Sequence, residues 1–197
     1  MNRSSQAAAL VLSLLTSQVR AQDFEAGVRA AKAGDYATAI GEWMPLAEQG
    51  EAAAQYNVGI FYSKGFGVPL SDVEAVRWFT LAADQGLPDA QFAVGRAYAN
   101  GEGVPENYVE AAKWFRSASV QGNLDAQTAL GGLYLVGEGV PHDYSLGYMW
   151  IYLGSAIDTS EAKFLLGVAN VYLAPSEREA AQARAGICLA SNYQICD

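Results

Sequence analysis

The residues that could carry acid–base chemistry are few. His142 is the only histidine of the 197-residue chain, and it stands beside Asp143 in a segment rich in glycine and proline. Glu102 and Glu138 recur in two similar loops and would project along one edge, too far apart for paired carboxylate chemistry. Nucleophilic catalysis needs a nucleophile, a base and an orienting group within reach of one another. We therefore interpret these side chains as solvated loop residues, predict no catalytic residue, and predict that the protein is not an enzyme.

A glycine-rich loop occurs three times, as GFGVP at 65–69 and as GEGVP at 101–105 and 137–141. A phosphate-binding loop would need a preceding strand and a following Lys-Ser/Thr pair, and neither is present. Glycine can end a helix in the left-handed conformation, and proline prevents the chain from continuing as helix. The loops are therefore predicted to connect helices.

The two cysteines, Cys188 and Cys196, are separated by seven residues, which is too many for a Cys-x-x-Cys redox motif. His142 is far away in sequence, so a zinc site of the usual Cys/His type is not expected, and no metal or other cofactor is predicted. In an oxidising compartment an even pair of cysteines normally closes. We favour a structural disulfide over two free thiols.

The amino terminus has the pattern of a secretory signal peptide. Arg3 precedes the apolar run AAALVLSLL, and Val19-Arg20-Ala21 ends in a small residue, which predicts a signal peptide over 1–21. The apolar run is much shorter than the roughly 20 residues of a membrane-spanning helix. An uncleaved anchor is the alternative. The predicted location is periplasmic or secreted, without stable membrane insertion after cleavage.

The chain is acidic, with a formal net charge of −9 and no basic cluster. This balance argues against a nucleic-acid partner and against binding to an anionic lipid surface. The acidic charge mainly indicates solubility, and an acidic docking face is the alternative.

A 36-residue period organises the chain. The positions that repeat include Gly59, Gly95 and Gly131; Pro69, Pro105 and Pro141; and Trp78, Trp114 and Trp150. A period of this length is typical of stacked supersecondary units. Residues 22–197 are predicted to form one all-α repeat domain, with units at about 23–50, 51–86, 87–122, 123–158 and 159–197, the last a carboxy-terminal cap.

Each regular unit is predicted to hold two helices, here called helix A and helix B. In one unit, helix A runs from Asp89 to Ala99 and helix B from Asn107 to Val120. Helix B is expected to cross helix A closely at Gly95, with Ala111 as the matching small residue. In the cap, Ser176 is predicted to start a helix that ends near Ala190, with a left-handed residue at Asn192.

Residues 51–156 resemble Sel1-like repeats, which are relatives of the tetratricopeptide repeat. The resemblance is carried by A-x-x-x-x-G-x-x-Y, G-x-G-V-P, A-x-x-W-F and the closing Q-G. It implies a right-handed α-solenoid of about four to five stacked hairpins and an adaptor that holds partners together. A secreted cysteine-rich branch of the family has a C-x7-C bridge in each repeat, and some of its members bind or hydrolyse penicillins. Here that spacing occurs once, at Cys188 and Cys196.

In such a solenoid the A helices line the concave face, where a protein or peptide partner would bind. The residues three before, one after and four after each repeat glycine are expected to point into this face. The candidate partner-binding residues are Tyr56, Ile60, Ser63, Phe92, Arg96, Thr128, Leu135 and Phe164. Aromatic residues and arginine often dominate interface energies. We predict a non-catalytic exported scaffold, an adaptor or regulator of the cell envelope, of unknown oligomeric state. The alternatives are a weak β-lactam-binding or hydrolysing enzyme and an oligomerising structural module.

Overall fold

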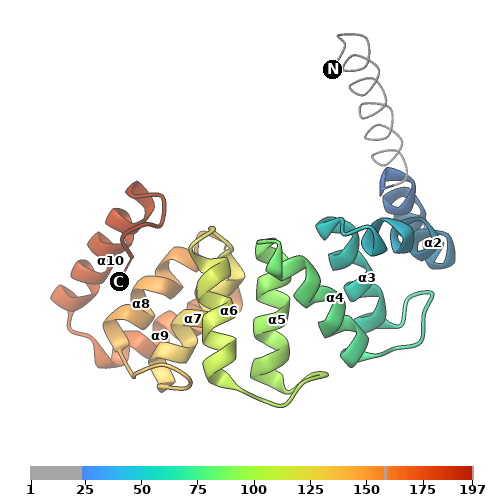
Figure 1. Cartoon of the computed structure of the whole chain (residues 1–197). Helices are drawn as coiled ribbons and strands as arrows, with labels where there is room; N and C mark the ends of the chain where they lie inside the picture. Colours follow the sequence, from blue (N-terminus) through green and yellow to red (C-terminus); the bar gives the residue numbers. More distant parts are fainter. Residues whose placement is uncertain (1–23, 158, 197) are drawn as a thin grey trace, which may run out of the picture. The chain divides into compact units, whose positions relative to one another are not determined.

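The computed structural model describes residues 24–157 and 159–196, and the signal peptide predicted for 1–21 lies outside this range. The described residues form helices and no strand (Figure 1). Within them, no helix combines the length and the apolar composition needed to cross a membrane. The chain divides into two compact units, Met1–Leu81 and Ala82–Asp197.

The first unit contains the helical segment 24–32, α2 (Tyr36–Glu48), α3 (Ala52–Lys64) and most of α4 (Asp72–Asp84). α2 packs against α3. Their shared core is built from Trp43, Val58, Phe61 and Trp78, all of them buried. Tyr36 and Phe66 extend the core into the loop after α3, where their rings stack with centroids 4.3 Å apart.

The second unit is a series of paired helices. It contains α5 (Pro88–Asn100), α6 (Tyr108–Ser119), α7 (Leu124–Val136), α8 (Tyr144–Gly154), α9 (Ser160–Tyr172) and α10 (Pro175–Ala190). α5 packs with α6 and α7 with α8, which matches the predicted helices A and B. α6 then packs on α7, and α8 on α9, so that neighbouring pairs stack within this unit. Leu130, Met149, Trp150 and Ile151 are fully buried in its core.

The loops between helices A and B follow one design. Helices α3, α5 and α7 are each followed by a capping glycine with a positive φ near 70°: Gly65, Gly101 and Gly137. The last loop residue then donates its backbone N–H to a carbonyl of helix A: Asn107 donates to Tyr98 at 2.8 Å and Asp143 to Tyr134 at 3.0 Å. The side chain of Asn107 caps α6 by accepting N–H bonds from its first turn. The prediction that these loops connect helices is therefore confirmed.

The repeat glycines mark the closest approach of helices A and B. A methyl group placed at Gly95 would lie 2.5 Å from Cδ1 of Phe115, and one at Gly131 would lie 2.5 Å from Cγ1 of Ile151. Gly59 of the first unit has the same relation to Phe79. Ala111 is fully buried in the α5–α6 pair. The predicted close crossing is confirmed, and the large partner at the glycine is the aromatic or branched residue of helix B.

Three buried glutamines join a helix B to the next helix A, at α2–α3, α4–α5 and α6–α7. Their side-chain Nε2 groups donate to a carbonyl eight residues earlier: Gln55 to Ala47, Gln91 to Ala83 and Gln127 to Ser119. Each of these carbonyls lies in the last turn of its helix and also accepts a backbone N–H, from Gly50, Gly86 and Gly122 respectively, so the amide adds a second hydrogen bond. The three glutamines lie 36 residues apart, and their role did not emerge from the sequence.

The carboxy-terminal helices depart from the pattern. α10 packs against α8 rather than closely along α9 (Figure 1). It begins at Pro175, and the N–H of Ala174 donates to the carboxylate of Glu177 at 2.7 Å. The prediction that Ser176 caps this helix is wrong, because proline occupies the first helical position, where no N–H is needed, and a glutamate closes the turn.

The end of the chain agrees with the sequence prediction. α10 ends at Ala190, and Asn192 has a positive φ of 51°. Cys188 and Cys196 are joined in a disulfide. Both cysteines are buried, so the bridge fixes the last segment against the helix.

Candidate functional site

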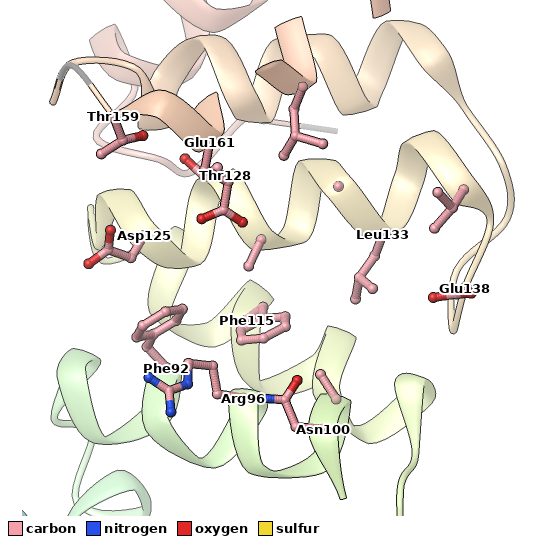
Figure 2. Close-up of a pocket in the computed structure, with 15 residues that line it drawn as sticks. Phe92, Arg96, Asn100, Phe115, Asp125, Thr128, Leu133, Glu138, Thr159 and Glu161 are labelled. Carbon is pink, nitrogen blue, oxygen red and sulfur yellow. The ribbon is translucent and has the colours of Figure 1, made fainter. Parts of the chain in front are cut away.

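A groove of about 450 Å³ lies in the second unit on the A helices α5, α7 and α9 (Figure 2). Its lining residues are Phe92, Arg96, Ala99, Asn100, Phe115, Asp125, Thr128, Ala129, Gly132, Leu133, Val136, Glu138, Thr159, Glu161 and Leu165. All but Phe115 come from helices A or from the residues at their ends. The repeat therefore builds the groove by placing consecutive A helices side by side.

The floor of the groove is apolar. Phe92 lies one turn before Gly95 and packs on Phe115 of helix B, with ring centroids 5.7 Å apart. Leu133 of α7 is buried, and Leu165 of α9 is partly buried. Val136, at the end of α7, keeps 63% of its surface exposed. The floor can therefore take apolar side chains of a ligand while its own aromatic pair stays packed.

The rim of the groove is acidic. Asp125, Glu138 and Glu161 line it and are exposed. Arg96 is the single cation among the lining residues, and its Nη2 lies 3.5 Å from Oε2 of Glu102. Because Glu102 already balances Arg96, three further carboxylates are left without a balancing cation among the lining residues. This arrangement favours a positively charged ligand.

The hydroxyl groups of Thr128 and Thr159, which line the groove, form hydrogen bonds with the backbone of their own helices. Thr128 Oγ1 donates to the carbonyl of Leu124 at 3.1 Å, and Thr159 Oγ1 accepts the N–H of Ala162 at 3.2 Å. His142 does not line the groove and packs edge-on against Tyr144. Among the described residues, histidine, cysteine and acidic side chains form no group suited to hold a metal ion. The arrangement can bind a ligand, and nothing in it favours the hydrolytic alternative.

Three of the sequence candidates meet in the groove: Phe92, Arg96 and Thr128. Leu135 does not. Only 5% of its surface is exposed, and it fills the space left by the missing side chain of Gly147 on α8. The prediction that Leu135 points into the concave face is wrong, because in α7 this position faces helix B. Phe164 is 70% exposed on α9 but does not line the groove.

The other three candidates lie in the first unit. Tyr56 packs on Phe79, with ring centroids 5.6 Å apart. Ile60 is partly buried against the core of that unit, and Ser63 donates its hydroxyl to the Ile60 carbonyl at 2.9 Å. Their role in partner binding stays a prediction.

The acidic rim was missed, although the sequence carries a signal for part of it. Asp125 and Glu161 occupy the same repeat position, 36 residues apart, and Asp89 precedes them at the same interval. Glu138 was interpreted as a solvated loop acid, and the structure adds that its loop borders the groove. A carboxylate that recurs at the start of successive A helices indicates that these side chains lie along one edge of the surface formed by the A helices.

Three Sel1 repeats match the chain, at residues 52–87, 88–123 and 124–156, and together they span more than half of it. The chain belongs to the Sel1 repeat family, and its fold is that of an all-α repeat solenoid.

Two solved structures support this assignment. One is a Sel1 repeat protein from Oxalobacter formigenes, 32% identical, with a TM-score of 0.68 over 74% of this chain and 60% of that one. The other is a protective antigen present in uropathogenic Escherichia coli strains that displays an SLR fold. It is 26% identical, with a TM-score of 0.68 over 91% of this chain and 43% of that one. The present chain thus spans about half the length of these relatives. No curated protein matches it.

Proposed function

We propose that this protein is an exported, non-catalytic scaffold that binds a peptide segment of a partner protein in the groove of its second unit. Sel1 repeats generally serve protein–protein interaction, which supports a binding role. The observation that carries the proposal is the combination of an apolar floor at Phe92 and Leu165 with an acidic rim at Asp125 and Glu161. A peptide with an apolar side chain flanked by lysine or arginine fits this combination.

The contribution of each part of the groove follows from its chemistry. Apolar contact with the floor supplies most of the affinity, because partly exposed aromatic and aliphatic groups leave water on binding. The exposed carboxylates guide a basic partner and select against acidic ones. Arg96 is paired with Glu102, so a carbonyl or carboxylate of the ligand that accepts a hydrogen bond from its guanidinium would share Arg96 with Glu102.

Export to the periplasm or the exterior belongs to the same proposal. The signal-peptide pattern of residues 1–21 and the Cys188–Cys196 disulfide support it. Mass spectrometry of the protein recovered from the periplasm and the medium is the test. A mature chain that begins at Gln22 is expected, and a chain retained in the cytoplasm with residues 1–21 intact would contradict export.

Binding in the groove is tested with selected peptides. A random-peptide display library is selected on the wild-type protein, and the recovered peptides are measured against Phe92→Ala/Arg96→Ala and against Asp125→Lys/Glu161→Lys. We expect basic peptides with an apolar centre. Their affinity should drop at least about tenfold in both variants: loss of the central contact with Phe92 costs about 2 kcal/mol, which outweighs removal of the Arg96 charge, and the lysines repel a basic peptide. Pull-down from envelope extract with the same variants then identifies the natural partner.

The matched control is Arg77→Ala/Tyr152→Ala. Arg77 is an exposed arginine paired with Glu74, as Arg96 is with Glu102, and Tyr152 is an exposed aromatic side chain on α8. Neither residue lines the groove, so this variant should bind as the wild type does. Peptides that bind all the variants equally would remove the groove as the binding site.

A further inference from the structure

The repeat glycine of α9 has no helix packed on it. Gly59, Gly95 and Gly131 are buried under a residue of their own helix B, but a methyl group placed at Gly167 would meet no atom within 4 Å. Gly167 continues the same 36-residue series. The face of α9 that should receive a helix B is therefore open.

The large side chains around Gly167 are likewise not covered by a helix. In two of the regular repeats the residue three before the glycine packs on a helix B aromatic, as Tyr56 does on Phe79 and Phe92 on Phe115. Phe164 holds this position in α9, yet it is 70% exposed. Val171, one turn after the glycine, is 79% exposed. Phe164, Gly167, Asn170 and Val171 lie on one side of the helix and are all exposed; they are called the open α9 face.

α10 leaves this face open because it packs elsewhere. Ala181, Ala185 and Cys188 are its buried residues, and α10 lies against α8. Near the turn, Arg178 of α10 still donates to the side-chain oxygen of Asn170 at 3.0 Å. A cleft of about 320 Å³ lies between α8, α9 and α10, and its lining includes Asn170, Arg178 and Gln182. The two last helices are thus splayed apart rather than closed as a hairpin.

The outer side of α10 has the residue pattern of a helix B. Ala180, Ala183, Gly186 and Ile187 are exposed on it and are called the open α10 face. Ile187 is 56% exposed, and a methyl group placed at Gly186 would also meet no atom within 4 Å. Ala183 and Ile187 repeat the small-x-x-x-large spacing of Gly147 and Ile151, the pair that covers Gly131 in α7. One chain therefore carries both halves of a repeat interface, and the two halves do not meet.

We propose that a second copy of this chain closes both faces, with α9 of each copy packed on α10 of the other. The two faces are complementary in the manner of the α5–α6 and α7–α8 pairs, in which a glycine on helix A receives a large side chain of helix B. The arrangement has two-fold symmetry, because each copy supplies one open α9 face and one open α10 face. Stable dimers bury about 1,200–2,000 Å² in total. One helix face alone falls short of this area. The reciprocal contact buries four helix faces, two from each copy.

The residues at the centre of both faces are uncharged, which suits burial in spite of the acidic net charge of the chain. Phe164, Gly167 and Val171 on one face and Ala183 and Ile187 on the other have no ionisable group to desolvate. Exposed apolar residues of this size on neighbouring helices mark interaction surfaces in soluble proteins.

Light scattering over a concentration series tests the proposal. The wild type is expected to have twice the mass of one chain, and Phe164→Glu and Ala183→Glu are each expected to be monomeric. Both substituted residues are exposed, so circular dichroism and thermal unfolding should show folded proteins. Val109→Glu is the control: Val109 is 52% exposed on α6, away from both faces, and the variant should remain dimeric. A monomeric wild type, a dimer that survives both substitutions, or a dimer lost in only one of them would overturn the reciprocal pairing.

Cross-linking tests which helices meet. The only two cysteines of the chain are joined to each other, so an added cysteine is the single free thiol of its variant. Phe164→Cys and Ile187→Cys proteins are prepared separately, mixed and oxidised. A covalent heterodimer that forms in the mixture faster than either homodimer supports the α9–α10 contact, and homodimers formed at equal or higher rates contradict it.

Discussion

Gly95 lies directly beneath the ring of Phe115, so close that a single added methyl group would come within 2.5 Å of Cδ1. The relation joins the two helices of one repeat and explains why a glycine stands in the interior of a helix, where it is otherwise unfavourable. The same position in α9, Gly167, is open.

The first prediction compares these two glycines. Gly95→Ala should lower the free energy of unfolding by about 1–3 kcal/mol, because the buried crossing becomes overpacked. Gly167→Ala, measured in the monomeric Ala183→Glu background, should raise it by about 0.5–1 kcal/mol, because alanine favours helix and meets no neighbour within the chain. Urea unfolding followed by circular dichroism measures both values. An equal loss in the two variants would show that helix crossing does not explain the repeat glycine.

The second prediction concerns Gln91. Its Nε2 donates to the carbonyl of Ala83 at 3.3 Å, and its Oε1 accepts from Gln121 at 2.7 Å. Gln91→Leu removes both of these hydrogen bonds, while the Ala83 carbonyl keeps its bond from the backbone N–H of Gly86. At about 0.5–1.5 kcal/mol for each bond, the free energy of unfolding should fall by about 1–3 kcal/mol. Gln49→Leu is the control, since Gln49 makes a comparable bond to the Pro45 carbonyl but is exposed. The control should change stability by less than about 0.5 kcal/mol.

The third prediction concerns the disulfide. Opening the Cys188–Cys196 bridge should destabilise the chain by about 2.5 kcal/mol, the chain-entropy value for a loop of this length. Unfolding is measured with and without reductant, and the double variant Cys188→Ala/Cys196→Ala serves as the reference that reductant cannot alter. Hydrogen exchange should increase mainly from α10 to the end of the chain. An unchanged midpoint on reduction would contradict a stabilising role.

The fourth prediction concerns pH. Hydrogen bonds from the side chain and the backbone N–H of Thr38 hold the pKa of Asp35 below its ordinary value of 3.8. A lowered pKa in the folded state means that Asp35 contributes stability above the unfolded value. That contribution is lost as the pH falls through the lower folded value. Asp35→Asn keeps an acceptor for the helix and should flatten the dependence of stability on pH in this acidic range. A profile identical to that of the wild type would show that Asp35 does not contribute.

The regular hairpins could be predicted because their signals are local and recur. The glycine-rich loops and capping side chains placed the helices within one or two residues, as α5 and α6 show. Phe92 and Arg96 reached the groove because they share a helix face set by the repeat glycine.

The parts that could not be predicted depend on neighbours beyond the repeat. Leu135 is buried because Gly147 leaves space on α8, whereas Ala99 at the equivalent position of α5 lines the groove. Arg96 pairs with Glu102 only because the loop after α5 turns back toward it. The splay of α10 from α9 depends on competition between two packing surfaces, and no local motif reports the outcome.

The glutamine amides that bridge successive repeats set a rule for how such a chain can change in length. Gln127 donates eight positions back, to Ser119. If residues 88–123 were removed, Ala83 would stand eight positions before it, and Ala83 is the carbonyl that Gln91 uses now. Gain or loss of whole 36-residue periods therefore preserves every donor–acceptor pair, while an insertion between a glutamine and its acceptor breaks one. Evolution of this architecture is expected to proceed by duplication and excision of entire repeats.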